Sequence, residues 1–249
     1  MRRTSVLMIV LVLTALFAFA QGSRNNIQIV GAPNSPSPKG DVVFKIVEPA
    51  DGQVVEGPDV TVKFTIENWK LYKEPAGHGQ HIHFILDNQP YEAHYSTEAF
   101  IFKNVAPGAH VIRAFPGRPW HESVKQDSAF SMVQFYVVEK GTESAVDATL
   151  PMLVYSRPKG EYLISKPPHG QPQDGILVDF FLQNVELGKD GYVARLVVGG
   201  ATKDIESWQP FYVKGLRPGI YTFRLELLKD GKPVEGNFNS TERTILIKP

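Results

Sequence analysis

From Asp41 onward the sequence consists of short runs of alternating apolar and polar residues, each ended by glycine, proline or asparagine. Alternation with a period of two indicates β-strands, because successive side chains of a strand point to opposite faces of its sheet. No long window has the 3.6-residue period of a helix, so we expect an all-β protein. Strands are expected at 42–47, 60–67, 81–86, 91–95, 100–103, 109–115 and 130–138, and again at 152–155, 176–183, 192–198, 211–213, 221–228 and 244–247.

The two halves of the chain look like one scaffold used twice. The run Val60–Asn68 corresponds to Ile176–Asn184, and Val105–His110 corresponds to Leu216–Tyr221. The Leu-x-Pro-Gly-x-Tyr pattern of the last run resembles the tyrosine corner of immunoglobulin-like sandwiches, which build about seven short strands from about 100 residues. We therefore predict two tandem immunoglobulin-like β-sandwich domains.

An export signal precedes these domains. Two arginines are followed by an apolar run, and Ala18-Phe19-Ala20 has the small-x-small pattern of a cleavage site. The apolar run is short for a membrane span, so we expect an exported protein of the periplasm or extracellular space, with no transmembrane segment in the mature chain. The predicted organisation is a signal peptide at 1–20, a flexible linker rich in Pro, Ser and Asn at 21–40, one domain at 41–140 and a second at 149–249.

Composition excludes several classes of function. The chain has no cysteine, which excludes disulfides, thiol catalysis and thiolate metal sites. It carries 26 basic and 26 acidic residues without a basic stripe, so nucleic acid is not an expected partner. The sequence contains no Gly-x-Ser-x-Gly elbow, phosphate loop or His-Glu-x-x-His motif, and we do not expect an enzyme.

The histidines are unevenly distributed. Six of the seven lie between His78 and His121, and three of these fall in one short segment. Alternation sends the apolar residues of that segment into the core and leaves His81 and His83 on the outer face of their sheet. A hairpin at the Asp-Asn-Gln-Pro turn that follows places His83 opposite His94, within reach of one shared ion or ligand.

The second half of the chain serves as a control for the first. In the expected register it has Tyr192, Ala194 and Ile205 where the first half has His81, His83 and His94. The scaffold can therefore be built without imidazoles at these positions, and the cluster needs another explanation.

Other polar and aromatic residues are expected near the cluster. In an immunoglobulin-like sandwich the loop before His81 and the loop after Phe115 lie at the same end of the domain. Arg113 and Tyr136 should share the outer face of the sheet by alternation. The candidate ligand-binding residues are His78, Arg113, Arg118, Trp120, His121, Glu122 and Tyr136. His110, by contrast, takes the position of Tyr221 and is expected to be structural.

Three interpretations of the cluster remain open. In the first, His81, His83 and His94 bind a transition metal, copper or zinc, because imidazole suits both ions. Glu92, Glu122 or a water would complete the shell. In the second, which is the function we predict from the sequence with metal binding as the alternative, the outward cluster recognises a small ligand, a glycan or an envelope protein without catalysis. In the third, these are solvated residues of an envelope spacer.

The first domain resembles a family of small secreted bacterial domains. The residues that carry the resemblance are the Pro-x-Asp-Gly start within Glu48–Phe64, the Pro75-Ala76-Gly77 segment, the histidine-rich strand ending at Asp87, and Pro107-Gly108-x-His110. The match covers 43–138 and has His-Ile-His where the family tends to have consecutive histidines. The resemblance implies an immunoglobulin-like fold and an exported location, and it assigns no activity. The second domain resembles a generic bacterial sandwich.

Overall fold

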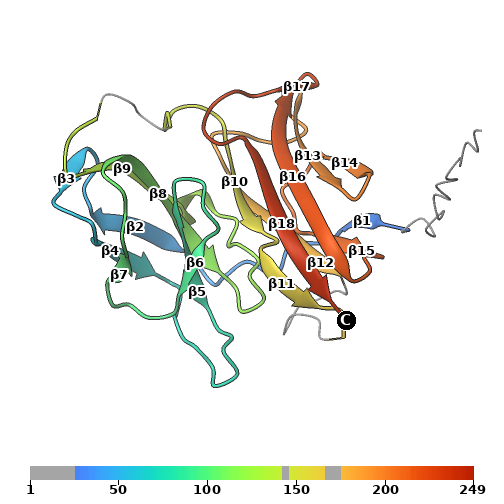
Figure 1. Ribbon diagram of the computed structural model, residues 1–249, viewed down its shortest axis with the longest axis horizontal. Coiled ribbons are helices and arrows are strands. Elements are labelled where there is room, and N and C mark those ends of the chain that lie inside the picture. The colour runs from blue at the N-terminus through green and yellow to red at the C-terminus, as the bar shows by residue number, and fades with distance from the viewer. Residues whose placement is uncertain (1–25, 142–145, 166–174) are drawn as a thin grey trace, which may run out of the picture.

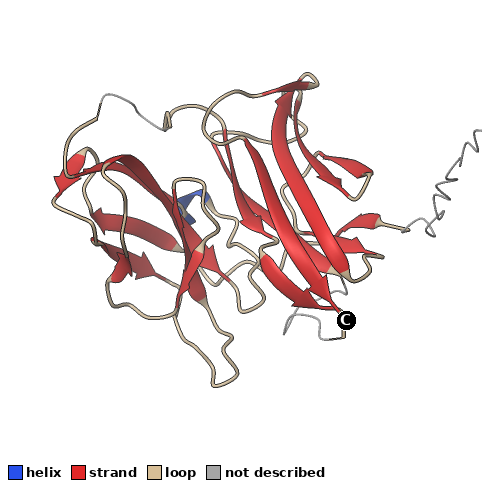
Figure 2. Cartoon of the chain, viewed as in Figure 1, coloured by secondary structure: helices blue, strands red, loops and turns tan. Residues whose placement is uncertain are grey.

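The computed structural model describes residues 26–141, 146–165 and 175–249, and these form an almost purely β structure (Figure 2). The strands that precede the second domain are β1 (Gln28–Gly31), β2 (Val43–Glu48), β3 (Gln53–Val55), β4 (Val60–Glu67), β5 (His81–Leu86), β6 (Glu92–His94), β7 (Phe100–Phe102), β8 (Gly108–Gly117) and β9 (Ser131–Val137), with a 3-10 turn at Asp127–Ala129. The remaining strands are β10 (Met152–Arg157), β11 (Gly160–Leu163), β12 (Ile176–Gln183), β13 (Tyr192–Val198), β14 (Ala201–Ile205), β15 (Phe211–Lys214), β16 (Gly219–Lys229), β17 (Lys232–Pro233) and β18 (Ser240–Lys248). The predicted all-β class is confirmed, and the predicted signal peptide lies outside the described residues.

Two sandwiches of the same topology account for these strands. In the first, a sheet of order β2-β4-β7 packs on a sheet of order β3-β9-β8-β5-β6. In the second, β10-β12-β15 packs on β11-β18-β16-β13-β14. In each sandwich the second strand pairs in parallel with the last one, as β3 does with β9 and β11 with β18. The expected duplication therefore extends to strand order and to the edge pairs that sequence reasoning missed.

Residues 28–31 correct the predicted linker. They form β1, which pairs antiparallel with β15 and so extends a sheet of the second sandwich. Ile27 and Ile29 alternate onto the core of that sandwich, and this apolar pair is the physical reason that the segment packs. The amide of Asn34 then donates a hydrogen bond to the carbonyl of Trp208 before the chain crosses to the first sandwich. The prediction of a flexible linker at 21–40 is wrong for this part.

The sandwiches lie side by side, and their contact has its own apolar core (Figure 1). The outer face of the β5, β8 and β9 sheet meets the outer face of β10 and β12. Phe115 stacks on Phe181 with ring centroids 5.0 Å apart, and Ile85 and Val111 pack in the same cluster. Both faces of β5 are therefore buried, which places the outward histidines between the two domains.

Candidate metal site

Three histidines converge at the junction of the two sandwiches. His81 and His83 lie on β5 and are fully buried, and His121 comes from the loop that follows β8. One ring nitrogen from each lies within 4.8 Å of the other two. The Nε2 atom of His81 is 2.8 Å from Nε2 of His83 and 3.0 Å from Nδ1 of His121. Three imidazoles at this spacing form a ligand set for one ion.

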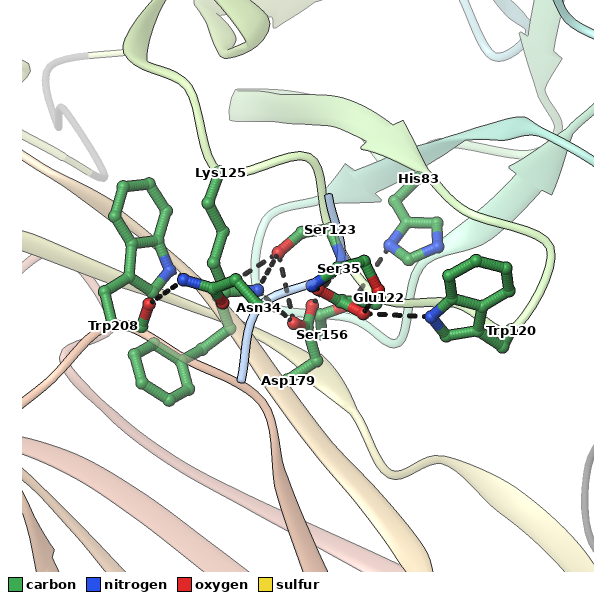
Figure 3. Close-up of polar contacts among 11 residues, drawn as sticks. Asn34, Ser35, His83, Trp120, Glu122, Ser123, Lys125, Ser156, Asp179 and Trp208 are labelled. Atoms are coloured by element: carbon green, nitrogen blue, oxygen red, sulfur yellow. Dashed lines mark hydrogen bonds and ion pairs between the residues drawn. The ribbon is translucent and has the colours of Figure 1, made fainter. Parts of the chain in front are cut away.

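The outer nitrogens of the two strand histidines already have partners. The carbonyl of Gly79 accepts a hydrogen bond of 2.8 Å from Nδ1 of His81, which leaves Nε2 of that neutral ring with a lone pair. Nδ1 of His83 lies 3.0 Å from the hydroxyl of Ser156 on β10 (Figure 3). A serine hydroxyl both donates and accepts, so it fits His83 whether Nε2 carries a proton or binds an ion. Such outer partners orient metal-binding histidines.

His121 is held by the two residues that follow it. The carboxylate of Glu122 accepts hydrogen bonds of 3.0 and 2.5 Å from the backbone nitrogen and hydroxyl of Ser35, and Ser123 donates to Asp179 of β12 through its backbone nitrogen (Figure 3). His121 itself has a φ of 73°, a left-handed conformation that costs a non-glycine residue about 1–3 kcal/mol and persists only where its surroundings hold it. Two contacts therefore position this imidazole, one with β12 of the second sandwich and one with the segment between β1 and β2.

Gly117 leaves the space that the ring nitrogens face. A Cβ at this position would lie 2.5 Å from Nε2 of His83 and 3.1 Å from Nε2 of His81. Separations below 3 Å are not tolerated, so any larger residue would displace the rings. This glycine is required by the space it leaves rather than by its backbone conformation.

Burial keeps the cluster neutral. Desolvation is the main cause that lowers the pKa of His81 to about 4, and it holds the pKa of His83 and of His121 well below the usual value. The charges of Arg157 and Lys159 act in the same direction and are weaker causes. All three imidazoles are unprotonated at neutral pH, which is the form that binds metal ions.

Tyr91 forms one wall of the cluster. Its ring stacks on His83 at a centroid distance of 3.7 Å, and its hydroxyl lies 3.1 Å from Nδ1 of His121. Burial raises its pKa, so the metal-free phenol is protonated. Two cations face the same ring, Lys159 at 4.0 Å and Arg157 at 5.1 Å from the centroid. Burial and the charge of Arg157 lower the pKa of Lys159 to about 8.

The structure does not bring His94 to this site, which corrects the predicted metal set. The β5–β6 hairpin pairs His94 with Ile82 rather than with His83, a shift of one residue. Because strand faces alternate, this shift turns His94 to the core side, where its ring lies 5.9 Å from Phe64. Its Nε2 donates to the carbonyl of Glu98. His121, predicted only as a rim residue, takes its place.

The second sandwich gives the same register. Its core residue Ala194 pairs with Ile205, as the core residue Ile82 pairs with His94. The aligned positions are therefore Ile82 with Ala194, His94 with Ile205, His81 with Val193 and His83 with Arg195. The expected match of His94 is right, and the other two are one residue off. Imidazoles remain absent from the second copy of the site.

The predicted outward cluster is wrong in its exposure. His81 and His83 do lie on the outer face of their sheet, but the second sandwich covers that face. Arg113 is buried on the same face, where it donates to the carbonyl of Asp87 and lies over the ring of Phe238. The pattern missed this cover, although largely apolar runs, broken only by Arg113 within Val111–Phe115 of β8 and by Asp179 within Ile176–Leu182 of β12, are the signal that both faces are buried.

Four of the remaining predicted ligand residues lie near His121, and the fifth, Tyr136, does not. Arg118, Trp120 and Glu122 lie beside His121, where Arg118 donates to the carbonyl of Pro36 and Trp120 donates to Glu122. His78 is half-buried, and its charge contributes to the low pKa of His121. Tyr136 pairs with Ala109 near the other end of β8, away from the cluster. These residues do not form one exposed surface.

His110 behaves as the sequence predicts. Its Nε2 donates to the carbonyl of Ala106, four residues earlier, and Nδ1 lies 2.9 Å from the carboxylate of Asp87. The hydroxyl of Tyr221 likewise reaches back four residues, to the backbone nitrogen of Arg217. Both residues tie a corner, and neither belongs to the site. The sequence pattern did not point to several residues of the site and its support, among them Tyr91, Gly117, Ser156, Arg157, Lys159 and Asp179.

Comparison with known proteins gives no family. No protein-family model and no curated protein matches the chain, so the resemblance of its first domain to secreted bacterial domains stays a prediction. Among solved structures, the fibronectin(III)-like modules of Clostridium thermocellum CbhA are 11% identical, with 83% of this chain and 94% of that chain covered and a TM-score of 0.28. The D0-D1 domain of Intimin is 11% identical, with coverages of 83% and 100% and a TM-score of 0.27.

A third solved structure is the Bacteroides ovatus protein SGBP-B in complex with a mixed-linkage heptasaccharide. It is 10% identical, with 89% of this chain and 47% of that chain covered and a TM-score of 0.23. Likeness at this level carries no argument about ligands. In the part of the chain that the structure describes, no helix is long and apolar enough to cross a membrane.

Proposed function

We propose that this chain is an exported, non-enzymatic protein that binds one transition-metal ion, copper or zinc, through His81, His83 and His121. The observation that carries the proposal is the convergence of three neutral imidazoles whose nitrogens lie within 4.8 Å of one another. The carbonyl of Gly79 and the hydroxyl of Ser156 hold the strand histidines from outside. Copper and zinc are the ions that such a sulfur-free imidazole set suits.

The spacing fits after small adjustments. Zinc–nitrogen bonds of about 2.0–2.1 Å in a tetrahedral site place ligand nitrogens about 3.3–3.4 Å apart. The two nitrogen pairs at 2.8 and 3.0 Å would move apart by a few tenths of an ångström. The third pair, between His83 and His121, is no more than 4.8 Å apart and would adjust to the same spacing. The absence of a side chain at Gly117 keeps the space beside Nε2 of His83 and of His81 free of protein atoms. The nearby cations oppose a metal ion, but burial outweighs them in setting the charge of the rings.

Sequence features support the exported location and the binding role. The basic start, apolar run and small-x-small site of the first twenty residues support export to the periplasm or extracellular space. The lack of any nucleophile motif supports a binding role rather than catalysis. The recognition hypothesis loses support because its residues are buried or engaged with one another, and the ion is the ligand that the enclosed cluster favours.

Calorimetric titration of tag-free protein with Cu²⁺ and Zn²⁺ tests the proposal. His121→Asn is the informative variant, because asparagine tolerates the left-handed backbone of this position and removes the imidazole. His94→Asn is the matched control, since it also removes one histidine. Wild type and the control should bind one ion, and His121→Asn should bind at least 100-fold more weakly.

Thermal melting gives a second readout. Metal at 100 times its dissociation constant stabilises a protein by about 2.7 kcal/mol, which is a Tm rise of about 5–10 °C for a chain of this size. A chelator should reverse the rise. Wild-type protein that binds neither ion, or a His121→Asn variant that binds as tightly as wild type, would overturn the proposal.

A further inference from the structure

Tyr91 is buried beside the histidines and contacts two of them. It lies just before β6, is 1% exposed, and directs its hydroxyl to within 3.1 Å of Nδ1 of His121. The parallel stacking of its ring on His83, with an interplanar angle of 11°, fixes the direction of the phenol. The hydroxyl therefore approaches one of the three nitrogens that would surround the ion.

The charge of the site calls for an anion. A divalent ion on three neutral imidazoles brings two positive charges into a buried position, and Arg157 and Lys159 already face it. Buried charge without compensation is costly. Among the described residues, the group of metal-binding side chains contains the three histidines and no carboxylate.

Neither of the two carboxylates considered from the sequence belongs to the group of possible metal ligands. Glu122 accepts hydrogen bonds from Ser35 and Trp120. Glu92 lies at an exposed position of β6, opposite Phe84. The phenol of Tyr91 is therefore the group that can supply a negative charge at the nitrogens.

We infer that Tyr91 is the fourth ligand of the ion, bound through its phenolic oxygen, so that three imidazoles and one phenolate enclose the metal. This inference rests on the proposed function. Binding breaks the phenol O–H bond, forms a metal–oxygen bond and releases the proton to solvent, with no change of oxidation state. Arg157 and Lys159, which lie over the ring face, stabilise the anion that forms.

The ligand set also predicts which ion is preferred. Cuprous copper prefers soft sulfur ligands, whereas divalent ions accept imidazole and harder oxygen donors. A phenolate in the shell therefore favours Cu²⁺ and Zn²⁺ over Cu⁺. The loss of the phenolate should reduce affinity for the divalent ions and leave affinity for the cuprous ion little changed.

The test compares Tyr91→Phe with Tyr95→Phe. Tyr95 also packs against His81, at a ring distance of 4.9 Å, and serves as the matched control. Titration of wild type with Cu²⁺ should develop a visible phenolate-to-copper charge-transfer band with phenolate modes in resonance Raman spectra. The band should be absent in Tyr91→Phe and present in the control. Zn²⁺ affinity should fall by about 10–100-fold in Tyr91→Phe only. This loss is at least as large as the one caused by removing a group that hydrogen-bonds to a metal ligand.

The outcomes separate the two proposals. If wild type and Tyr91→Phe bind Cu²⁺ equally and neither has the band, Tyr91 is not a ligand and the histidine site stands. If wild type binds no ion, the metal function fails and Tyr91 fails with it. Matching far-ultraviolet circular dichroism and melting of metal-free wild type and Tyr91→Phe establish that the variant is folded.

Discussion

The pair formed by Lys125 and Asp179 allows a sharp test of how the two sandwiches are joined. Asp179 lies on β12 with a fully buried side chain, and its carboxylate accepts a bond of 2.6 Å from Lys125, whose side chain is 8% exposed. It also accepts from the backbone nitrogen of Ser123 at 3.0 Å. Burial nevertheless raises the pKa of Asp179, because the partners do not fully offset its desolvation.

This balance predicts opposite effects for single and double substitutions. Lys125→Met leaves a buried carboxylate without its cation and should destabilise the protein by about 3–5 kcal/mol at pH 7. Adding Asp179→Asn removes the second charge and keeps an oxygen for the nitrogen of Ser123. The double variant should therefore lie within about 1–2 kcal/mol of wild type, since the cost of an unpaired buried charge disappears.

The dependence on pH follows from the sign of the shift. A carboxyl with a raised folded-state pKa binds its proton more readily when folded than when unfolded, so its contribution to stability rises as pH falls through the folded pKa. Loss of Lys125 raises the pKa further. The penalty of Lys125→Met should therefore shrink by up to about 1.4 kcal/mol for each pH unit between pH 7 and 5.

Urea denaturation of the single and double variants at several pH values measures these free energies. A double-mutant cycle with Asp179→Asn gives the coupling between the two residues. Additive effects of the two substitutions, or a penalty for Lys125→Met that does not change between pH 7 and 5, would refute the reasoning.

Three further predictions concern the site and the first strand. Gly117→Ala should lose metal binding and about 1–3 kcal/mol of stability, because its Cβ would lie 2.5 Å from Nε2 of His83, whereas Gly141→Ala, with contacts no closer than 3.9 Å, should behave as wild type in titration and melting. Ser156→Ala should weaken metal binding by about 10–100-fold in calorimetry, while the same change at exposed Ser96 should not, and equal affinities would contradict the role of the hydroxyl. Ile29→Asp should lower the urea midpoint because it removes an apolar contact with the second core, and Val30→Asp on the opposite face should have a smaller effect, so equal losses would argue against the packing of β1.

Alternation and repeat were sufficient to predict much of the architecture. The period of two placed His81 and His83 on the outer face correctly, and the match between Val60–Asn68 and Ile176–Asn184 predicted two copies of one scaffold. Asn68 and Asn184 both adopt a left-handed backbone at the end of that strand, with φ of 59° and 56°. These features depend on local side-chain chemistry, which a sequence carries directly.

The third ligand could not be predicted for two physical reasons. The turn after β5 was expected to place His83 opposite His94, but Asp87 adopts a φ of 51°, Tyr91 leaves the ladder to stack on His83, and His94 pairs with Ile82 instead. That one-residue shift turned His94 to the core. The proximity of His121 depends on contacts with Ser35 and Asp179, which are distant in sequence. Local patterns do not encode such contacts.

The place of β1 has a consequence for the order in which the chain folds. Gln28–Gly31 pair with β15, which spans Phe211–Lys214 and is made about 180 residues later. Loops that join such distant segments close late and slow folding. The first sandwich can form as soon as its own strands are complete, but β1 can pair only after β15 has been made. The segment that follows β1 carries Ser35 to Glu122 beside His121, so the support of this imidazole includes a contact that forms late in folding.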